Sequence, residues 1–341
     1  MVLGFWDLDV PIVGAPMAGG AGTPALAAAV SNAGGLGCLA SGYVSPERLA
    51  DDIAAARAAT TGPIGVNLFV PQPSVADVYQ LNHYAEALDE LAEHYGVDVG
   101  YPNFGDDDGW QQKLEVVADL RPEMVSFTFG APPPDVMRWF GALGMLLFNT
   151  VTSAYEAGVA LAAGADGLIV QGPDAGGHRG TFAPDMDPGT EALHVLLARI
   201  RRHARDVPLI AAGGIGSTED VAAVINRGAV AAQVGTALLL ADEAGTNAAH
   251  RAALQHPEFI STVVTRAFSG RYARGLENDF TRLFDDVAPL GYPEVNQMTS
   301  PIRRASAALD DPHGTNLWAG TAYRAATVGP AKDIVKTLGD V

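Results

Sequence analysis

ADGLIVQGPDAGGHRGT, residues Ala165–Thr181, is the stretch that decides the fold. Its apolar run, Gly167–Val170, predicts a buried parallel strand, because strands covered on both faces are apolar throughout. The strand ends at Gln171, and a glycine-rich loop follows it. Within that loop only His178 has an unperturbed pKa near neutrality. A strand end, an amide, bare glycines and a histidine together indicate a ligand site on an α/β scaffold.

Seven further short apolar runs lie before and after this strand, and Ala-rich amphipathic segments separate them. Together with the central run they make eight candidate strands that alternate with helices. That count and spacing favour a (β/α)8 TIM barrel over an open sheet. The seven runs are Pro11–Ala15, Gly34–Leu39, Ile64–Leu68, Met124–Phe129, Met145–Asn149, Pro208–Ala212 and Ala231–Val234.

Two regions depart from this alternation. Residues 71–110 form an insertion after strand three, with a helical pattern over Ser74–Tyr95 and an acidic run at Asp106–Asp108. The insertion is interpreted either as a lid or subunit contact, or as a solvated loop. Residues 247–341 are expected to be a mostly helical extension that packs on the barrel of residues 1–246 and does not fold as an independent domain.

Composition restricts the class of partner. The 341 residues carry a net charge of −18, with 21 Lys and Arg against 39 Asp and Glu, which argues against nucleic acid or an anionic membrane. Cys38 is the single cysteine, so neither an internal disulfide nor a cysteine-based metal site is expected. The first residues lack a signal-peptide pattern, and no run of about 18 apolar residues occurs. We therefore expect a cytoplasmic protein without a membrane span.

Two glycine-rich turns follow the last two predicted strands. They are AAGGIGS, with Gly213 and Gly214, and VGTALL, with Gly235 and Thr236. In a barrel these turns are neighbours at the carboxyl ends of the strands, where phosphate groups are commonly bound. Bare glycines leave backbone N–H groups open to phosphate oxygens, and helix N-termini add a favourable dipole. The pair of turns predicts a phosphate site.

A phosphate held there would place the rest of a cofactor over the mouth of the barrel. Met17, Asn67 and Gln171 follow other strands and would face it. Amide side chains supply both donors and acceptors, which suits the edge of a flavin ring. No G-x-G-x-x-G pattern with an acidic residue about 20 positions later is present, so FMN is favoured over a dinucleotide.

His178 lies seven residues after Gln171, within reach of such a ring. A neutral imidazole there would accept a C–H proton from a substrate or donate to a developing anion. The other histidines occur in a helix, in polar segments or in the extension. No pair has metal-ligand spacing such as H-E-x-x-H, and no G-x-S-x-G motif occurs, so no metal site is expected.

These motifs resemble the nitronate monooxygenase family, formerly 2-nitropropane dioxygenases, which are FMN-dependent barrels related to FMN-containing enoyl-acyl-carrier-protein reductases. The resemblance covers nearly the whole chain. It is carried by Pro11–Gly20, Ser31–Tyr43, Gly65–Phe69, Gln171–Phe182, Pro208–Ile215, Gln233–Leu239, Ser269–Asn278, Tyr292–Arg303 and Asn316–Ala326.

The resemblance implies that His178 is the catalytic base. It implies oxidation of alkyl nitronates by O2 to a carbonyl compound and nitrite, and leaves open whether neutral nitroalkanes are accepted. The partners are then a small nitronate and O2, with no nucleic acid and no membrane; a homo-oligomer stays open. The implied FMN contacts are Met17, Asn67, Gln171, Gly176, Gly213, Gly214, Gly235 and Thr236.

Alternative functions remain at this point. The first is an FMN-dependent NAD(P)H reductase of enoyl thioesters or quinones, although an acidic chain is a poor match for a carrier-protein substrate. The second is a flavin-binding protein without turnover. Arg271 and Arg274 are predicted either to attract an anionic substrate or to tie the extension to the barrel.

Overall fold

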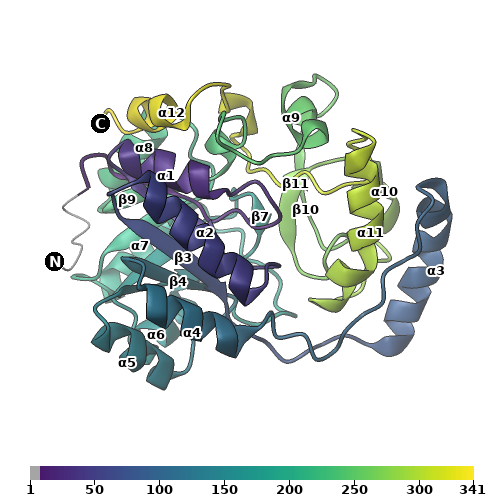
Figure 1. The fold of residues 1–341 in the computed structure, drawn as a ribbon, viewed down its shortest axis with the longest axis horizontal. Coiled ribbons are helices and arrows are strands. Elements are labelled where there is room, and N and C mark those ends of the chain that lie inside the picture. Colours follow the sequence, from purple (N-terminus) through teal and green to yellow (C-terminus); the bar gives the residue numbers. More distant parts are fainter. Residues whose placement is uncertain (1–7) are drawn as a thin grey trace.

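The computed structural model describes residues 8–341 and contains a closed barrel of eight parallel strands (Figure 1). Strand β9 pairs with β1 and closes the barrel. The predicted (β/α)8 fold is confirmed, with each predicted apolar run forming one strand. The strands are β1 (Ile12–Gly14), β2 (Leu36–Ala40), β3 (Ile64–Phe69), β4 (Met124–Thr128), β5 (Leu146–Val151), β6 (Gly167–Gln171), β8 (Leu209–Ala212) and β9 (Ala231–Val234).

Helices cover the outside of the barrel and begin at polar caps. The Thr23 hydroxyl accepts the Leu26 N–H at 3.0 Å, and Ser45, Ser153 and Ser217 cap three other helices in the same way. The surrounding helices are α1 (Pro24–Asn32), α2 (Pro46–Ala59), α4 (Trp110–Leu120), α5 (Pro134–Ala142), α6 (Ala154–Ala163), α7 (Leu193–His203) and α8 (Thr218–Ile225).

Buried apolar side chains fill the inside of the barrel. Val13, Phe148 and Ile210 come from different strands, and all three are fully buried. Gly167 begins β6 beside the Phe148 ring, and a Cβ at this position would lie 2.2 Å from that ring. The central strand therefore starts with glycine because the neighbouring strand contributes a phenylalanine to the barrel interior.

The extension is mostly helical, as predicted, but it also contains two strands that were not predicted. Strand β10 pairs antiparallel with β11, and β11 pairs with β7, a two-residue strand in the glycine-rich loop. This small sheet joins the extension to the loop that carries His178. The elements are β7 (Gly177–His178), α9 (Ala248–Gln255), β10 (Thr262–Thr265), β11 (Ala273–Leu276), α10 (Asp279–Phe284), α11 (Glu294–Ala308) and α12 (Ala331–Leu338).

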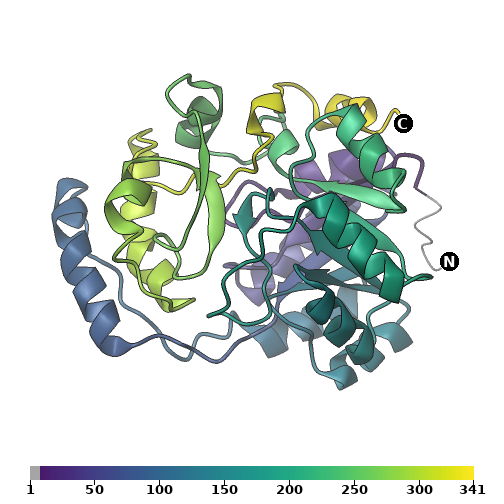
Figure 2. The ribbon, with the colours of Figure 1, turned by 180° about the vertical axis from the view of Figure 1, so that it is seen from behind.

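The insertion packs on the extension. Figures 1 and 2 both place helix α3 (Val78–His94) on the outer side of α10 and α11, away from the barrel. Its buried face, which includes Tyr84 and Leu88, shares one apolar cluster with Phe280 and Val295. The Tyr84 hydroxyl donates to the Ala267 carbonyl oxygen at 2.6 Å. Helix α3 is therefore held in place by the extension.

The acidic run at the end of the insertion fastens a barrel loop. Asp108 pairs with Lys113 at 2.7 Å, and Lys113 also donates to the Ser41 carbonyl oxygen at 2.7 Å. The other Asp108 oxygen accepts the Tyr43 N–H at 3.0 Å. Tyr43 adopts a left-handed backbone with φ of 68°, which is unusual for a residue with a bulky side chain. The insertion thus fixes Tyr43, whose hydroxyl accepts from that of Tyr292 at 3.1 Å.

The chain ends by returning to the barrel. Helix α12 lies beside α1 and α8, and its Val335 joins the apolar cluster that contains Ile12. Within residues 8–341, no helix is both long and apolar enough to cross a membrane. The expectation about a signal peptide concerns residues that lie partly outside this described range. The division of the chain at about residue 246 stays a prediction.

Candidate functional site

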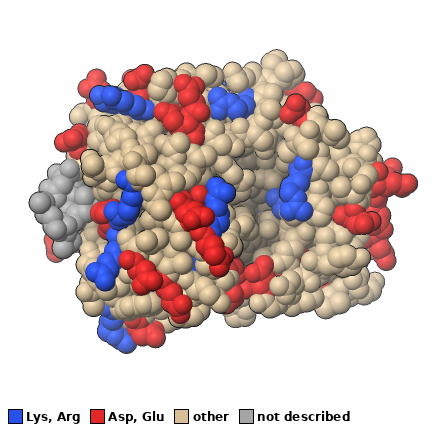
Figure 3. Space-filling view, in the orientation of Figure 1, with Lys and Arg blue, Asp and Glu red and all other residues tan. Residues whose placement is uncertain are grey.

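A cavity of about 500 Å³ lies between the carboxyl ends of the barrel strands and the extension. Figure 3 shows the surface hollowed near its centre, between these two parts of the molecule. The structure brings every predicted site residue to this one cavity, while their roles stay predictions. The residues are Met17, Asn67, Gln171, Gly176, His178, Gly213, Gly214, Gly235 and Thr236.

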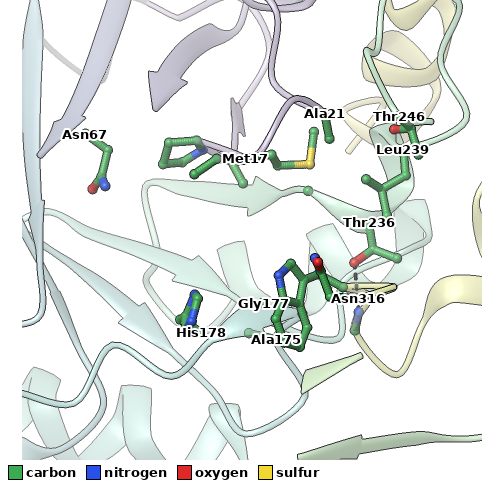
Figure 4. A pocket seen from close by; sticks show the side chains of 18 of the residues that line it. Met17, Ala21, Asn67, Ala175, Gly177, His178, Thr236, Leu239, Thr246 and Asn316 are labelled. Carbon is green, nitrogen blue, oxygen red and sulfur yellow. Dashed lines mark hydrogen bonds between the residues drawn. The ribbon is translucent and has the colours of Figure 1, made fainter. Parts of the chain in front are cut away.

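The two glycine turns form one wall of the cavity. Gly213 and Gly214 follow β8 with φ of 109° and 72°, a backbone that L side chains rarely adopt. A Cβ on either residue would also lie 2.9 Å from the backbone or side chain of the loop before His178. The Thr236 hydroxyl oxygen accepts the Gly320 N–H at 2.9 Å, so its own hydrogen remains available to a ligand (Figure 4). The wall has the donors and the bare backbone that a phosphate requires.

Asn67 lies at the opposite end of the cavity from Thr236 (Figure 4). Its side-chain oxygen accepts hydrogen bonds from the hydroxyls of Ser126 and Thr128, each at 2.9 Å. Those two contacts orient the amide and leave its Nδ2 as a donor. Asn67 can therefore donate to an acceptor on a bound ring.

Gln171 holds the loop that carries the histidine. Its Nε2 donates to the His178 carbonyl oxygen at 3.0 Å, and its Oε1 accepts the Gly180 N–H at 2.9 Å. The side chain therefore holds the loop backbone at His178 and at Gly180. One Nε2 hydrogen remains for a ligand, so the predicted cofactor contact and the positioning role are compatible.

Gly176 has a steric reason to be glycine. The segment around Gly320 crosses it closely, and a Cβ at Gly176 would lie 2.5 Å from the Gly320 backbone nitrogen. Real Cβ atoms do not approach backbone this closely, so the extension could not pack here against a larger residue. This glycine lets the extension close one side of the cavity.

His178 lies in an aromatic shell. The ring centroids of Phe129, Tyr292 and Trp318 lie 5.8, 5.6 and 5.6 Å from that of the imidazole. Burial, with help from two nearby arginines, lowers the pKa of His178 to about 3. The imidazole is consequently neutral throughout the physiological range.

Ser269 orients this imidazole from the extension. Its Oγ lies 2.8 Å from His178 Nε2 and donates to the Arg271 carbonyl oxygen at 3.1 Å. With the serine hydrogen in that second contact, Nε2 carries the hydrogen of the first. The Nδ1 atom then keeps a lone pair that can accept a proton.

The two arginines of the SGRYARG motif tie the extension to the barrel loops. Arg274 donates to the Pro173 carbonyl oxygen at 3.0 Å, and Arg271 donates to that of Thr181. The Arg271 guanidinium also lies 4.0 Å from the Phe129 ring centroid. Neither arginine lines the cavity, so the structure favours the tying role over direct attraction of a substrate.

Arg303 on α11 is a cavity residue that the sequence did not reveal. Its guanidinium donates to the Asn316 side chain at 2.9 Å and to the Asn296 backbone at 2.8 Å. Among residues 8–341 no carboxylate pairs with it, and burial lowers its pKa to about 10. Arg303 therefore places an unneutralised positive charge at the cavity.

Other lining residues were also missed. Gln233, Thr246, His250, Asn316 and Trp318 all contribute to the cavity. Gln233 lies in β9, just before the Gly-Thr turn that the sequence marks as a source of backbone donors. Thr246 is the last residue before the extension and the other three lie within it, and their sequence gives no periodic signal that they face the barrel. In the described part of the chain, no group of three or more His, Cys, Asp or Glu side chains could hold a metal ion.

The buried histidines make stability depend on pH. Burial lowers the pKa of His178 to about 3 and that of His250 to about 4, whereas an unfolded histidine titrates near 6.5. Between these values the unfolded chain binds protons that the folded protein does not. The contribution of these two histidines to the free energy of unfolding is therefore fully present above pH 6.5 and is lost as the pH falls. At pH 5 the loss is about 2 kcal/mol per histidine.

Urea unfolding of the cofactor-free protein at pH 7 and pH 5 measures this dependence. His178→Leu is expected to reduce the loss between the two pH values by about 2 kcal/mol. The control is His83→Ala, because the His83 side chain is 68% exposed and its removal leaves the loss unchanged. An unaltered loss in His178→Leu would show that this imidazole titrates normally in the folded protein.

A closed parallel barrel with two glycine turns and a buried histidine at its carboxyl-end cavity has the architecture of a (β/α)8-barrel enzyme. The family model described as nitronate monooxygenase matches residues 5–340. The chain belongs to the nitronate monooxygenase family and is an oxidoreductase. The alternative of a flavin binder without turnover is thereby set aside.

Relatives of known name agree with this assignment. A nitronate monooxygenase of Pseudomonas aeruginosa is 38% identical over 97% of this chain and 95% of its own length. The solved structure of nitroalkane oxidase from Streptomyces ansochromogenes is 43% identical in sequence to this chain and superposes on it with a TM-score of 0.93. The match covers 97% of this chain and 95% of that one. FabK from Thermotoga maritima is more distant, with 26% identity and a TM-score of 0.74, covering 98% and 93% of the two chains.

Proposed function

We propose that FMN is the cofactor of this cavity. The glycine turns and the Thr236 hydroxyl supply donors for a phosphate at one end, and Asn67 supplies a donor for the ring at the other. Gln233 Oε1 is buried beside the cavity and has no partner within residues 8–341, so it fits a ligand that donates. When bound, FMN supplies a redox centre that takes electrons from a substrate and returns them to O2.

The proposed reaction is oxidation of alkyl nitronates by O2 to a carbonyl compound and nitrite. Two nitronate ions and one O2 balance two carbonyl compounds and two nitrite ions. The observation that carries this proposal is the buried neutral imidazole of His178 at the cavity wall. With a neutral nitroalkane, Nδ1 would accept the C–H proton, and the nitronate formed beside the imidazolium would offset the cost of burying that charge.

Charge at the cavity favours an anionic substrate. Arg303 lines the cavity without a carboxylate partner, in a chain whose net charge is −18. A local positive charge with low-dielectric surroundings attracts an anion more strongly than the same charge in water. The nitronate form therefore needs only binding and orientation from this chain, whereas the neutral form also needs His178.

Anaerobic mixing of the FMN-loaded protein with an alkyl nitronate, followed by flavin absorbance, tests the proposed function. We expect the nitronate alone to bleach the flavin, and nitrite to be released when air is admitted. NADH without a nitro compound is the second arm and is expected to bleach it slowly or not at all. Rapid bleaching by NADH with an inert nitronate would move the chain to the NAD(P)H-dependent reductases.

A further inference from the structure

A second, smaller cavity of about 60 Å³ adjoins the cavity described above, and the two are called here the small and the main cavity. The acidic run Asp106–Asp108 of the insertion lines only the small one. Four side chains line both cavities and so form a common wall: Tyr43, Phe69, Phe129 and Asn296. The insertion therefore reaches the neighbourhood of the site through the small cavity, which the proposed reaction does not use.

Tyr292 lies between the small cavity and His178. Of the two cavities it lines the small one alone, yet its ring centroid lies 5.6 Å from that of His178, which lines the main one. The Tyr292 hydroxyl donates to that of Tyr43 at 3.1 Å, and the two ring centroids are 6.4 Å apart. The two tyrosine rings consequently stand where a path from His178 into the small cavity would run.

Contacts on two sides set the position of the Tyr43 ring. Asp108 accepts the Tyr43 N–H at 3.0 Å and holds the residue in its left-handed backbone with φ of 68°. Such a backbone persists for a bulky residue only where the surroundings fix it. Gly42 leaves room for Phe69, because a Cβ on Gly42 would lie 2.2 Å from the Phe69 ring. The Phe69 ring centroid in turn lies 5.9 Å from that of Tyr43.

The chemistry around His178 decides which end of a substrate faces this wall. The wall beside His178 is aromatic, with Phe129 and Tyr292 in contact with the imidazole, whereas Arg303 supplies positive charge at the main cavity. A charged nitronate group is drawn toward Arg303, so the alkyl group is left to face the rings. Burial of each added methylene there strengthens binding about fourfold. A longer chain extends along the wall until it meets the two tyrosines.

We propose that the Tyr43–Tyr292 pair limits the length of the substrate's alkyl chain, and that the small cavity is the space a longer chain enters once the pair is opened. This inference rests on the proposed function, because it takes the substrate to be an alkyl nitronate. The class of substrate is then a nitronate with a short, unbranched, apolar chain. The insertion becomes a determinant of specificity, since Asp108 holds one tyrosine of the pair.

Nitrite release from a series of primary nitronates, from ethyl to octyl, tests the limit. For the wild-type protein, kcat/KM is expected to rise with the first added methylenes and then to fall by at least about tenfold at one chain length. Tyr43→Ala removes the ring and is expected to move this fall to a longer chain, raising the octyl-to-ethyl ratio of kcat/KM by at least about tenfold. Tyr43→Phe keeps the ring and is expected to keep the wild-type limit.

Tyr292→Ala is an independent variant, because it removes the other ring of the pair. The octyl-to-ethyl ratio cancels a general effect of its contact with His178 and is expected to rise as in Tyr43→Ala. The control is Tyr155→Ala on α6, which is expected to leave the ratio unchanged, because Tyr155 is 76% exposed and lines neither cavity. Flavin content and thermal unfolding of each variant show whether it is loaded and folded.

The acidic lining adds a readout that a wider mouth of the main cavity would not give. Asp106 accepts from Gln297 Nε2 at 2.7 Å and Asp107 accepts the Gly109 N–H at 3.0 Å, and within residues 8–341 neither carboxylate pairs with a cation. A long-chain nitronate that ends in a carboxylate should therefore gain less than about twofold in Tyr43→Ala, because like charges repel. An equal gain for methyl-ended and carboxylate-ended chains would overturn the proposal, since the chain end would then lie in water.

Other results also overturn the proposal. A wild-type kcat/KM without a fall up to octyl would show that the chain leaves through the mouth of the main cavity. A fall that stays at the same length in both alanine variants would show that the tyrosines do not limit the chain. A fall that Tyr43→Phe moves as far as Tyr43→Ala would show a loosened wall and no ring in the path. If no nitronate of any length yields nitrite, the proposed function itself fails, and this inference fails with it.

Discussion

Replacing His178 with leucine is expected to lower kcat/KM for a neutral nitroalkane by about 10²- to 10⁴-fold. With the preformed nitronate the loss should stay below about tenfold, because no C–H proton has to be removed. The two substrates share the same cavity, cofactor and product, so the ratio of the two effects isolates proton transfer. Nitrite release from each substrate, with flavin content measured per mole of protein, gives this ratio.

The control for that experiment is His203→Ala, at the exposed end of α7, which should leave both rates unchanged. An equal loss on both substrates would contradict the role as base and would assign His178 to binding of the nitro group. Because the pKa of His178 lies at about 3 in the ligand-free protein, its titration should produce no acid limb between pH 5 and 8 in kcat/KM. Such a limb near pH 6.5, lost in the leucine variant, would show a normal imidazole.

Lys113→Met is expected to lower the free energy of unfolding by about 3 kcal/mol, because it removes one partner of a largely buried ion pair. The Lys113 side chain is 2% exposed and that of Asp108 is 28% exposed, so Asp108 would keep a charge with little solvent to compensate it. The Ser41 carbonyl oxygen would lose its donor at the same time. Urea unfolding at pH 7 measures the loss.

Combining Lys113→Met with Asp108→Asn tests the origin of that loss. The double variant leaves no unpaired charge and should recover part of the stability lost in Lys113→Met. Lys332→Met, on the exposed side of α12, is the control and should change stability by less than about 0.5 kcal/mol. A loss below about 1 kcal/mol for Lys113→Met would mean that the pair behaves as a surface ion pair.

The barrel could be predicted because each of its strands is marked in the local sequence. Runs such as Gly167–Val170 and Pro208–Ala212 are apolar throughout, as strands covered on both faces must be. The two glycine turns could be predicted equally well, since Gly213 and Gly214 adopt a backbone that favours glycine. These features are local, and a single sequence contains them in full.

The small sheet could not be predicted in the same way. Gly177–His178 is a strand only because it pairs with Ala273 and Arg274, about a hundred positions later. The β-branched run Thr262–Thr265 did carry a strand signal, but it stood alone in a segment without a strand–helix repeat. Pairing between distant segments decides this part of the fold.

The candidate site likewise has a part that the sequence predicts and a part that it does not. The predicted residues follow barrel strands, so knowing the fold was enough to bring them together. Arg303 and His250 reach the cavity only because the extension folds back over the barrel. In the sequence they look like an ordinary helical arginine and a histidine near a helix start. Within residues 8–341, the missing carboxylate partner of Arg303 and the unpaired Nε2 of His250 are visible only in three dimensions.

The position of helix α12 has a consequence for how the chain is made. The chain emerges from the ribosome N-terminus first while it is synthesised at about 5–20 residues per second. Ile12 would emerge early, yet its apolar cluster includes Ile334, Val335 and Leu338, which emerge more than three hundred residues later. For most of its synthesis the nascent chain therefore exposes an apolar surface that only its last helix covers. Translation that stalls before residue 331 should yield a product that chaperones retain.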